Sequence, residues 1–267
     1  MNSKTVRLEN GEATIIDCGK IHIHVYNTKD AIDDQVIILE RKGIIGSEGV
    51  VIEQPCFKNT IAEAERYIET NKIKIKGKLV AYHAAGSSFL PDVPVYMTDS
   101  AVAYNTNGGG KGLIDRFTGA FGEAFDSAIT DSGNRIDAGK LTLAGIDMVI
   151  NPDSDAYEVE IPSVKAVYMH MLGHDCHSIV AGPGHADVII ANLTKYLEKG
   201  YEIFLSSHYG PETREDVQTK IDYLNDLKAI AAGCSSVQEF KDAVNAKYKG
   251  YSGANYLDMT AGFFFSQ

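Results

Sequence analysis

Apolar and polar positions alternate with a strand-like period through much of the first hundred residues. Residues 21–26 place isoleucine or valine at every second position, and residues 36–40 form an apolar run of strand length. We expect strands over residues 21–26, 36–40, 48–53, 78–82 and 95–97. A helix over residues 61–68, capped by Asn59 or Thr60, interrupts this series because its apolar residues follow a helical spacing.

The middle of the chain is less regular. Asn107 to Gly110 is a glycine-rich segment, which predicts a turn or hinge. Such segments also cradle phosphate, but here neither a Gly-Lys-Ser/Thr ending nor a preceding strand supports that function. A helix is expected from about residue 113 to 129, with Phe117, Phe121 and Phe125 on one face.

The second half repeats the order of strands followed by helices. A hairpin is expected over residues 140–150, turning at Ala144-Gly145, and further elements follow it. We expect strands over residues 156–161 and 201–205, and helices near residues 186–199, 213–233 and 235–248. Strands and a helix, repeated twice, suit two sheets packed face to face with helices outside.

Composition and charge narrow the class of protein. The 267 residues are 44% hydrophobic, enough to bury a large core. A net charge of −11 disfavours nucleic acids and anionic membrane surfaces as partners. Met1 to Arg7 lacks the apolar core of a signal peptide, and the four cysteines show no Cys-x-x-Cys spacing. We therefore expect a cytoplasmic protein with reduced thiols, binding neither membrane nor nucleic acid.

Three segments resemble the metallo-β-lactamase superfamily. Residues 49–55 are similar to its apolar strand and acidic loop, residues 78–83 to the strand entering its His-x-His-x-Asp-His loop, and residues 201–211 to the late strand with its final histidine. The resemblance implies an α/β fold, a four-layer αββα sandwich, as a single domain over residues 1–267. It also implies a metal site at the loop-bearing edge between the sheets.

The family's metal ligands are only partly present. The loop here is His83-Ala-Ala-Gly-Ser-Ser, so alanine and serine stand where the family has further ligands. The mid-chain Pro-Gly-His is replaced by a segment containing Asp153, whereas His208 matches the family's last histidine. His83 and His208 would serve different ions of a two-zinc site. We therefore expect no two-zinc hydrolysis of the usual kind.

A further group of ligand-type residues follows residue 169. His174, Asp175 and His177 suit a borderline metal, and the segment resembles the histidine-rich part of the alkylsulfatase branch. Either His170 or Asp175 could replace the family's bridging aspartate. One interpretation is a rebuilt site made of His83, His170 or His174, Asp175 or His177, and His208. The alternative is that these groups hydrogen-bond one another without a metal.

Other candidates for catalysis are single residues. Ser87 lies close to His83 in sequence and could act as a nucleophile, although no Gly-x-Ser-x-Gly motif is present. Asp153 and Asp175 are candidate acids or bases, and aspartates at such positions are commonly turn residues. His22 and His24 lie on one strand face, where an exposed or satisfied role is expected.

Three functions are compatible with these observations. The first expectation is a degenerate metal site whose old cleft binds a small molecule. The alternative is a hydrolase of a small-molecule ester, amide or sulfate with one divalent metal, zinc by preference. The third is a structural protein, such as a homo-oligomer joined by aromatic surfaces. Fold alone does not decide among them.

Overall fold

The computed structural model describes residues 2–44, 46–130, 133–170 and 173–265. These residues form two compact units. The first comprises Met1–His170 and Leu205–Pro211, and the second comprises Met171–Phe204 and Glu212–Gln267. The assignment of the whole chain to a single domain stays a prediction.

An eight-stranded sheet forms the larger part of the first unit. Its strands follow chain order: β1 (Ser3–Arg7), β2 (Glu12–Cys18), β3 (Ile21–Asn27), β4 (Gln35–Lys42), β5 (Ser47–Ile52), β6 (Ile73–Leu79), β7 (Val95–Met97) and β8 (Asn134–Arg135). Pairing is antiparallel from β1 to β5 and parallel from β5 to β8. β6 begins and ends earlier than expected, because the alternation of Ile73 and Ile75 with lysines already has the strand period.

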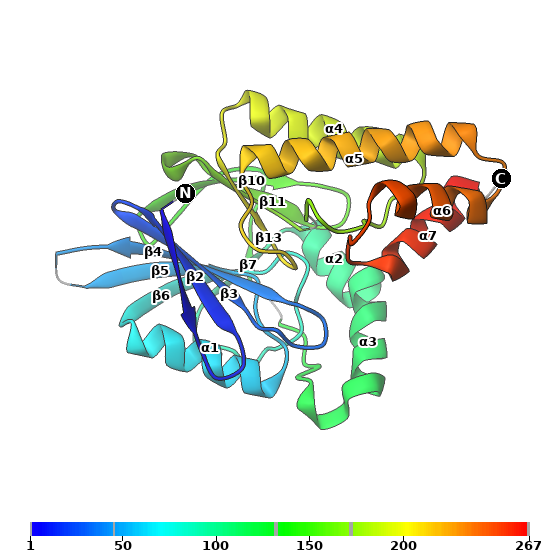
Figure 1. Cartoon of the computed structure of the whole chain (residues 1–267). Helices are drawn as coiled ribbons and strands as arrows, with labels where there is room; N and C mark the ends of the chain where they lie inside the picture. Colours follow the sequence, from blue (N-terminus) through cyan, green and yellow to red (C-terminus); the bar gives the residue numbers. More distant parts are fainter. Residues whose placement is uncertain (1, 45, 131–132, 171–172, 266–267) are drawn as a thin grey trace. The chain divides into compact units, whose positions relative to one another are not determined.

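Helix α1 (Lys58–Thr70) lies along one face of this sheet (Figure 1). Its apolar side, including Ile61 and Tyr67, packs against Tyr26 of β3 and Ile38 of β4. His22 and His24 share a face of β3 with Tyr26, because alternate residues of a strand point the same way. The two histidines therefore belong to the α1 side of the sheet.

A second, five-stranded sheet has the order β13-β12-β11-β10-β9. Its strands are β9 (Gly139–Leu143), β10 (Ile146–Pro152), β11 (Tyr157–Ile161), β12 (Ala166–Met169) and β13 (Ile203–Ser206), of which Leu205 and Ser206 belong to the first unit. The two sheets meet closely at Gly77, where an added Cβ would lie 3.1 Å from Leu143. The buried Tyr157 hydroxyl donates to the Tyr96 carbonyl at 3.1 Å.

Two helices occupy the middle of the first unit, where a turn was expected. α2 (Asp99–Asn107) and α3 (Gly109–Phe121) meet at Gly108, and a 3-10 turn, Gly122–Ala124, follows. The predicted hinge is thus a break between helices, and the predicted helix begins and ends earlier than expected. Phe121 and Phe125, which lies beyond the helix, both pack against Phe57, with ring centroids 5.0 and 5.6 Å from its ring.

The second unit is mainly helical. Its helices are α4 (Pro183–Glu198), α5 (Arg214–Gly233), α6 (Val237–Lys247) and α7 (Ala254–Phe265). α4 and α5 lie side by side (Figure 1). A capping box between Thr213 and Asp216 starts α5 close to its predicted position. Within the described ranges, the helices are too short or too polar to span a membrane.

Candidate functional site

Three histidines from separate loops of the first unit come together. His83 follows β6, His170 follows β12 and His208 follows β13. One ring nitrogen from each can be chosen so that all three lie within 4.8 Å of one another. The ring centroids are 4.8, 5.1 and 5.2 Å apart, so the rings form a nearly equilateral group, here called the three-histidine cluster.

The Nδ1 atom of His208 has a partner outside the cluster. It lies 3.3 Å from the carbonyl oxygen of Ile32. A carbonyl only accepts, so this Nδ1 carries the proton and Nε2 keeps a free lone pair. In metal sites, the histidine ligands likewise donate their other N–H to a carbonyl or carboxylate.

His170 is held by a chain of hydroxyl groups. Its Nδ1 lies 3.2 Å from Ser207 Oγ, which is 2.5 Å from the Tyr168 hydroxyl. The Tyr168 hydroxyl donates to the Glu53 carboxylate at 2.5 Å, so the Ser207 hydroxyl donates to Tyr168. Ser207 then accepts from His170 Nδ1–H. The Nε2 lone pair of His170 is therefore also left for the cluster.

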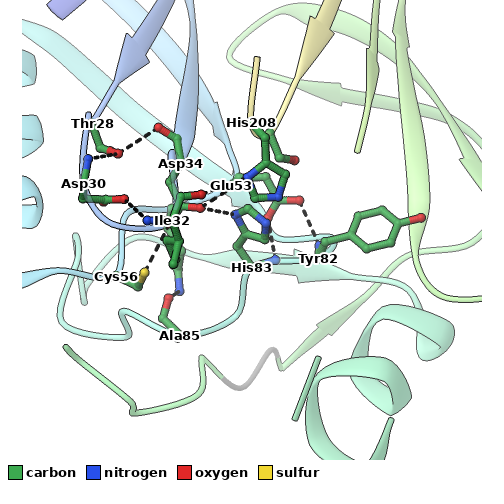
Figure 2. A network of polar contacts seen from close by, with 12 residues as sticks. Thr28, Asp30, Ile32, Asp34, Glu53, Cys56, Tyr82, His83, Ala85 and His208 are labelled. Carbon is green, nitrogen blue, oxygen red and sulfur yellow. Dashed lines mark hydrogen bonds and ion pairs between the residues drawn. The ribbon is translucent and has the colours of Figure 1, made fainter. Parts of the chain in front are cut away.

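His83 faces a buried carboxylate. Its Nδ1 lies 3.3 Å from Asp34 Oδ1, and Figure 2 shows the Asp34 side chain extending between Cys56 and His83. The Cys56 thiol donates to Asp34 Oδ2 at 3.2 Å. Among the described residues, neither Asp34 Oδ1 nor His83 Nδ1 has a hydrogen bond, although both atoms are buried. Two adjacent buried polar atoms without hydrogen bonds fit a site that binds a cation.

Burial keeps the three rings in their neutral form. It lowers the pKa of His83 to about 4, and burial together with His83 lowers the pKa of His208 to about 3. The pKa of His170 falls well below its ordinary value for the same reasons. Burial raises the pKa of Asp34 well above its usual range, and the neighbouring Asp30 adds to this. Neutral imidazole is the form that binds metal ions.

Glu53 fixes the loop that carries His83. Its backbone has a φ of 62°, a left-handed conformation directly after β5. Its carboxylate accepts the backbone N–H groups of Ala81, Tyr82 and His83 at 3.3, 2.9 and 3.0 Å. Burial raises the pKa of Glu53, although these hydrogen bonds and that of Tyr168 act in the opposite direction. Glu53 thus links the loop that carries His83 to the hydrogen-bonded hydroxyl groups of Tyr168 and Ser207 that hold His170.

Asp153 reaches the cluster through a tyrosine. The Tyr82 ring stacks on His170, with centroids 4.0 Å apart and an interplanar angle of 11°. The Tyr82 hydroxyl donates to Asp153 at 2.5 Å. Asp153 also accepts the backbone N–H groups of residues 155 and 156, so it caps its own turn. The structure places this candidate beside Tyr82.

The loop after His83 is held in place by side-chain packing and backbone hydrogen bonds. Ala85 is 5% exposed and packs with Phe57, Ile114 and Phe125. The Ser87 backbone N–H donates to the carbonyl of residue 128 at 3.1 Å. In the part of the chain that the structure describes, no hydrogen bond joins the Ser87 hydroxyl to His83. Apolar packing and backbone hydrogen bonds thus account for the described part of this loop.

His174, Asp175 and His177 belong to the second unit and have partners there. His174 Nδ1 is 2.8 Å from Glu212. Burial lowers the pKa of His174, but Glu212, Asp216 and Asp175 together raise it above its ordinary value. His177 Nδ1 is 2.9 Å from the Tyr223 hydroxyl, and the Asp175 carbonyl accepts from the backbone of residue 252.

Several residues around the cluster were missed by reasoning from the sequence. Asp34 and Ser207 contact its histidines directly. Glu53 carried a usable signal, because it is an acidic residue directly after an apolar strand. Ser207 carried none that distinguishes it from other residues at a strand end.

Comparison with known proteins gives structural neighbours. No family model and no curated protein sequence matches the chain. A beta-lactamase domain protein from Burkholderia ambifaria has a TM-score of 0.64 at 9% identity, covering 93% of this chain and 86% of its own. A metallo-beta-lactamase family protein from Thermus thermophilus has a TM-score of 0.58 at 10% identity, covering 89% and 91%.

A stereoselective inverting sec-alkylsulfatase from Pseudomonas sp. is also similar. Its TM-score is 0.59 at 14% identity, and the match covers 92% of this chain. The chain spans about half of that enzyme's length, 49%. These likenesses confirm the predicted α/β class and the metallo-β-lactamase type of fold.

Proposed function

We propose that this chain of metallo-β-lactamase fold holds one zinc ion between His83, His170 and His208 and hydrolyses an ester, amide or sulfate of a small molecule. The observation that supports it is the convergence of one nitrogen from each ring within 4.8 Å. Three imidazoles with a fourth position for water are a known catalytic zinc ligand set. Zinc bound there would act as a Lewis acid and lower the pKa of a water molecule.

The surrounding residues prepare the ligands. Ile32 and Ser207 hold the Nδ1 protons of His208 and His170, which directs both Nε2 lone pairs to the cluster. Asp34 offsets positive charge beside His83 from a position of 1% exposure. Tyr82 covers one face of His170, which keeps water from that side of the ring. These are positioning roles, and each acts through a histidine.

A single ion fits this site better than two. A second ion of the family type needs ligands from the loop after His83. Ala85 in that loop packs against Phe57 and Phe125, and the loop backbone is tied to residues 126–130. The same packing gives no added support to the metal-free alternative, in which the lost ligands would leave room for a small molecule.

The test is the metal content of untagged protein, measured by elemental mass spectrometry together with hydrolysis of nitrophenyl esters and sulfates. We expect zinc to fall in His83→Ala and in His208→Ala, and to stay in His185→Ala, a matched change at an exposed histidine. Chelation should abolish hydrolysis and added zinc should restore it. Zinc content equal in all four proteins, or no metal above background in any, would overturn the proposal and favour metal-free binding.

A further inference from the structure

A second group of ligand-type side chains lies on the α1 face of the first sheet. His22 and His24 alternate on β3, and Glu40 on β4 is the direct register partner of His22. Glu40 Oε2 lies 3.7 Å from His22 Nδ1 and 3.1 Å from His24 Nε2. One ligand atom from each of the three residues lies within 4.8 Å of the others.

The remote nitrogen of each ring has its own partner. His22 Nε2 lies 3.3 Å from Asp17 Oδ1, and His24 Nδ1 lies 2.7 Å from the Tyr67 hydroxyl. A carboxylate behind a histidine is a usual arrangement around a metal ligand, because it sets the tautomer and the ring orientation, and the Tyr67 hydroxyl is able to accept from His24 Nδ1–H in a similar way. Both rings therefore present their other nitrogen to the same carboxylate oxygen.

Solvent reaches this group through a surface pocket of about 390 Å³. Asp17, Lys42 and Asn71 line the pocket together with the three ligand-type residues. His22 and Glu40 are 16% and 7% exposed, so an ion from solution can reach them without unfolding the sheet. The exposed Lys4 and Lys42 also line the pocket, and their positive charges would oppose a cation.

We propose that His22, His24 and Glu40 form a second metal site, separate from the three-histidine cluster, that binds zinc. Two imidazoles and one carboxylate suit a borderline divalent cation, and a fourth position stays open to solvent. The ion would join β3 to β4 and, through Tyr67, fix the end of α1. Binding to the native state alone would stabilise the fold.

The test is a zinc titration of the metal-free full chain, followed by calorimetry and elemental analysis. His22→Ala and Glu40→Gln should each lose one equivalent of bound zinc that His83→Ala retains. His83→Ala should in turn lose an equivalent that His22→Ala keeps. Failure of this site is thereby distinguished from failure of the three-histidine cluster.

Two milder variants test the site without changing its ligands. Asp17→Asn, at a residue that is 52% exposed, should weaken zinc binding about tenfold, because the partner of His22 loses its charge. Lys42→Met should strengthen zinc binding, which a purely structural role of the group does not predict. Unchanged stoichiometry in His22→Ala with unchanged affinity in both milder variants would overturn the proposal.

Discussion

The two histidine groups of the first unit use their ring nitrogens differently. In the three-histidine cluster, the Nδ1 atoms of His170 and His208 have partners outside the cluster, Ser207 and Ile32, which leaves their Nε2 lone pairs free for a ligand. In the group of His22, His24 and Glu40, a carboxylate lies between the rings. One group thus gathers lone pairs, whereas the other already contains a counter-charge.

The pKa shifts of the two groups follow from this difference. Burial lowers the pKa of each ring in the three-histidine cluster, with no compensating carboxylate between the rings. Burial raises the pKa of Glu40, but hydrogen bonds from Ser47 and His24 together with the charges of His24 and Lys42 outweigh it, so the pKa of Glu40 is lowered overall. Each ring nitrogen of His22 and His24 has a polar partner, whereas the first group leaves His83 Nδ1 and Asp34 Oδ1 without a hydrogen bond among the described residues. Bound zinc should therefore change the hydrogen bonding of the three-histidine cluster more than that of the group of His22, His24 and Glu40.

The largest expected effect is a difference in stability between a variant of Glu53, which supports the three-histidine cluster, and a variant of Glu40, which belongs to the second group. Glu53→Gln should lower the free energy of unfolding by about 4 kcal/mol, because an amide donor would face three backbone donors in a buried site. Glu40→Gln should cost the metal-free protein about 1 kcal/mol. Urea denaturation of both variants measures this, and equal losses would contradict the contrast.

A pH dependence that belongs to neither group comes from Lys78. Burial lowers the pKa of Lys78 from 10.5 to about 8, although the charge of Glu65 acts in the opposite direction. Between these values the unfolded chain binds more protons, so the stability of the wild type should rise with pH by about 3 kcal/mol relative to Lys78→Met. Below pH 8 both states are protonated and the difference is constant. Denaturation at pH 7 to 10 checks this, and a relative fall with pH would refute it.

The variant Asp34→Asn tests whether a carboxyl group beside His83 supports zinc binding at the three-histidine cluster. It should weaken zinc binding at the three-histidine cluster about 100-fold, or about 2.7 kcal/mol, because an amide, unlike the carboxyl group of Asp34, cannot ionise to balance the charge of a bound ion. The metal-free variant should be no less stable than the wild type, since a buried carboxylate is removed. Calorimetric zinc titration and metal-free melting measure the two effects. Unchanged zinc affinity would show that Asp34 plays no part in binding.

The smallest expected effect is a difference in stability loss between variants of two tyrosines, one beside each histidine group. Tyr67→Phe leaves the buried His24 Nδ1 without its partner and should cost about 1 kcal/mol of stability. Tyr82→Phe keeps the stacking on His170 and loses a hydrogen bond to an exposed aspartate, so about 0.5 kcal/mol is expected. Thermal melts in chelator provide the comparison. A larger loss for Tyr82→Phe would reverse it.

Local patterns predicted much of the fold. The alternation over residues 21–26 and the apolar run over residues 36–40 both lie within strands, and the helices near residues 213–233 and 235–248 are α5 and α6. α2 was missed because its apolar residues, Ala101 to Tyr104, are consecutive and a glycine-rich segment follows, so the sequence lacks a strong helical period. Its start is set instead by Thr98, which accepts from the Ala101 N–H at 3.1 Å.

The candidate site was less accessible to prediction. The resemblance selected His83 and His208, but it left His170, His174 and His177 as alternatives. A few residues of sequence separation do not indicate which side chain faces a distant loop. His170 shares the first unit with His83 and His208, whereas His174 and His177 find partners in the second unit.

The sequence by itself determined many of the strands and helices, and that His22 and His24 share a face, because these properties depend on the spacing of neighbouring residues. Only the tertiary structure decided that His83, His170 and His208 converge, and that Asp34 and Glu53 support them. Convergence depends on strand order, on register and on loop conformations such as the left-handed backbone of Glu53. Those are set by packing across the whole unit, which no local pattern encodes.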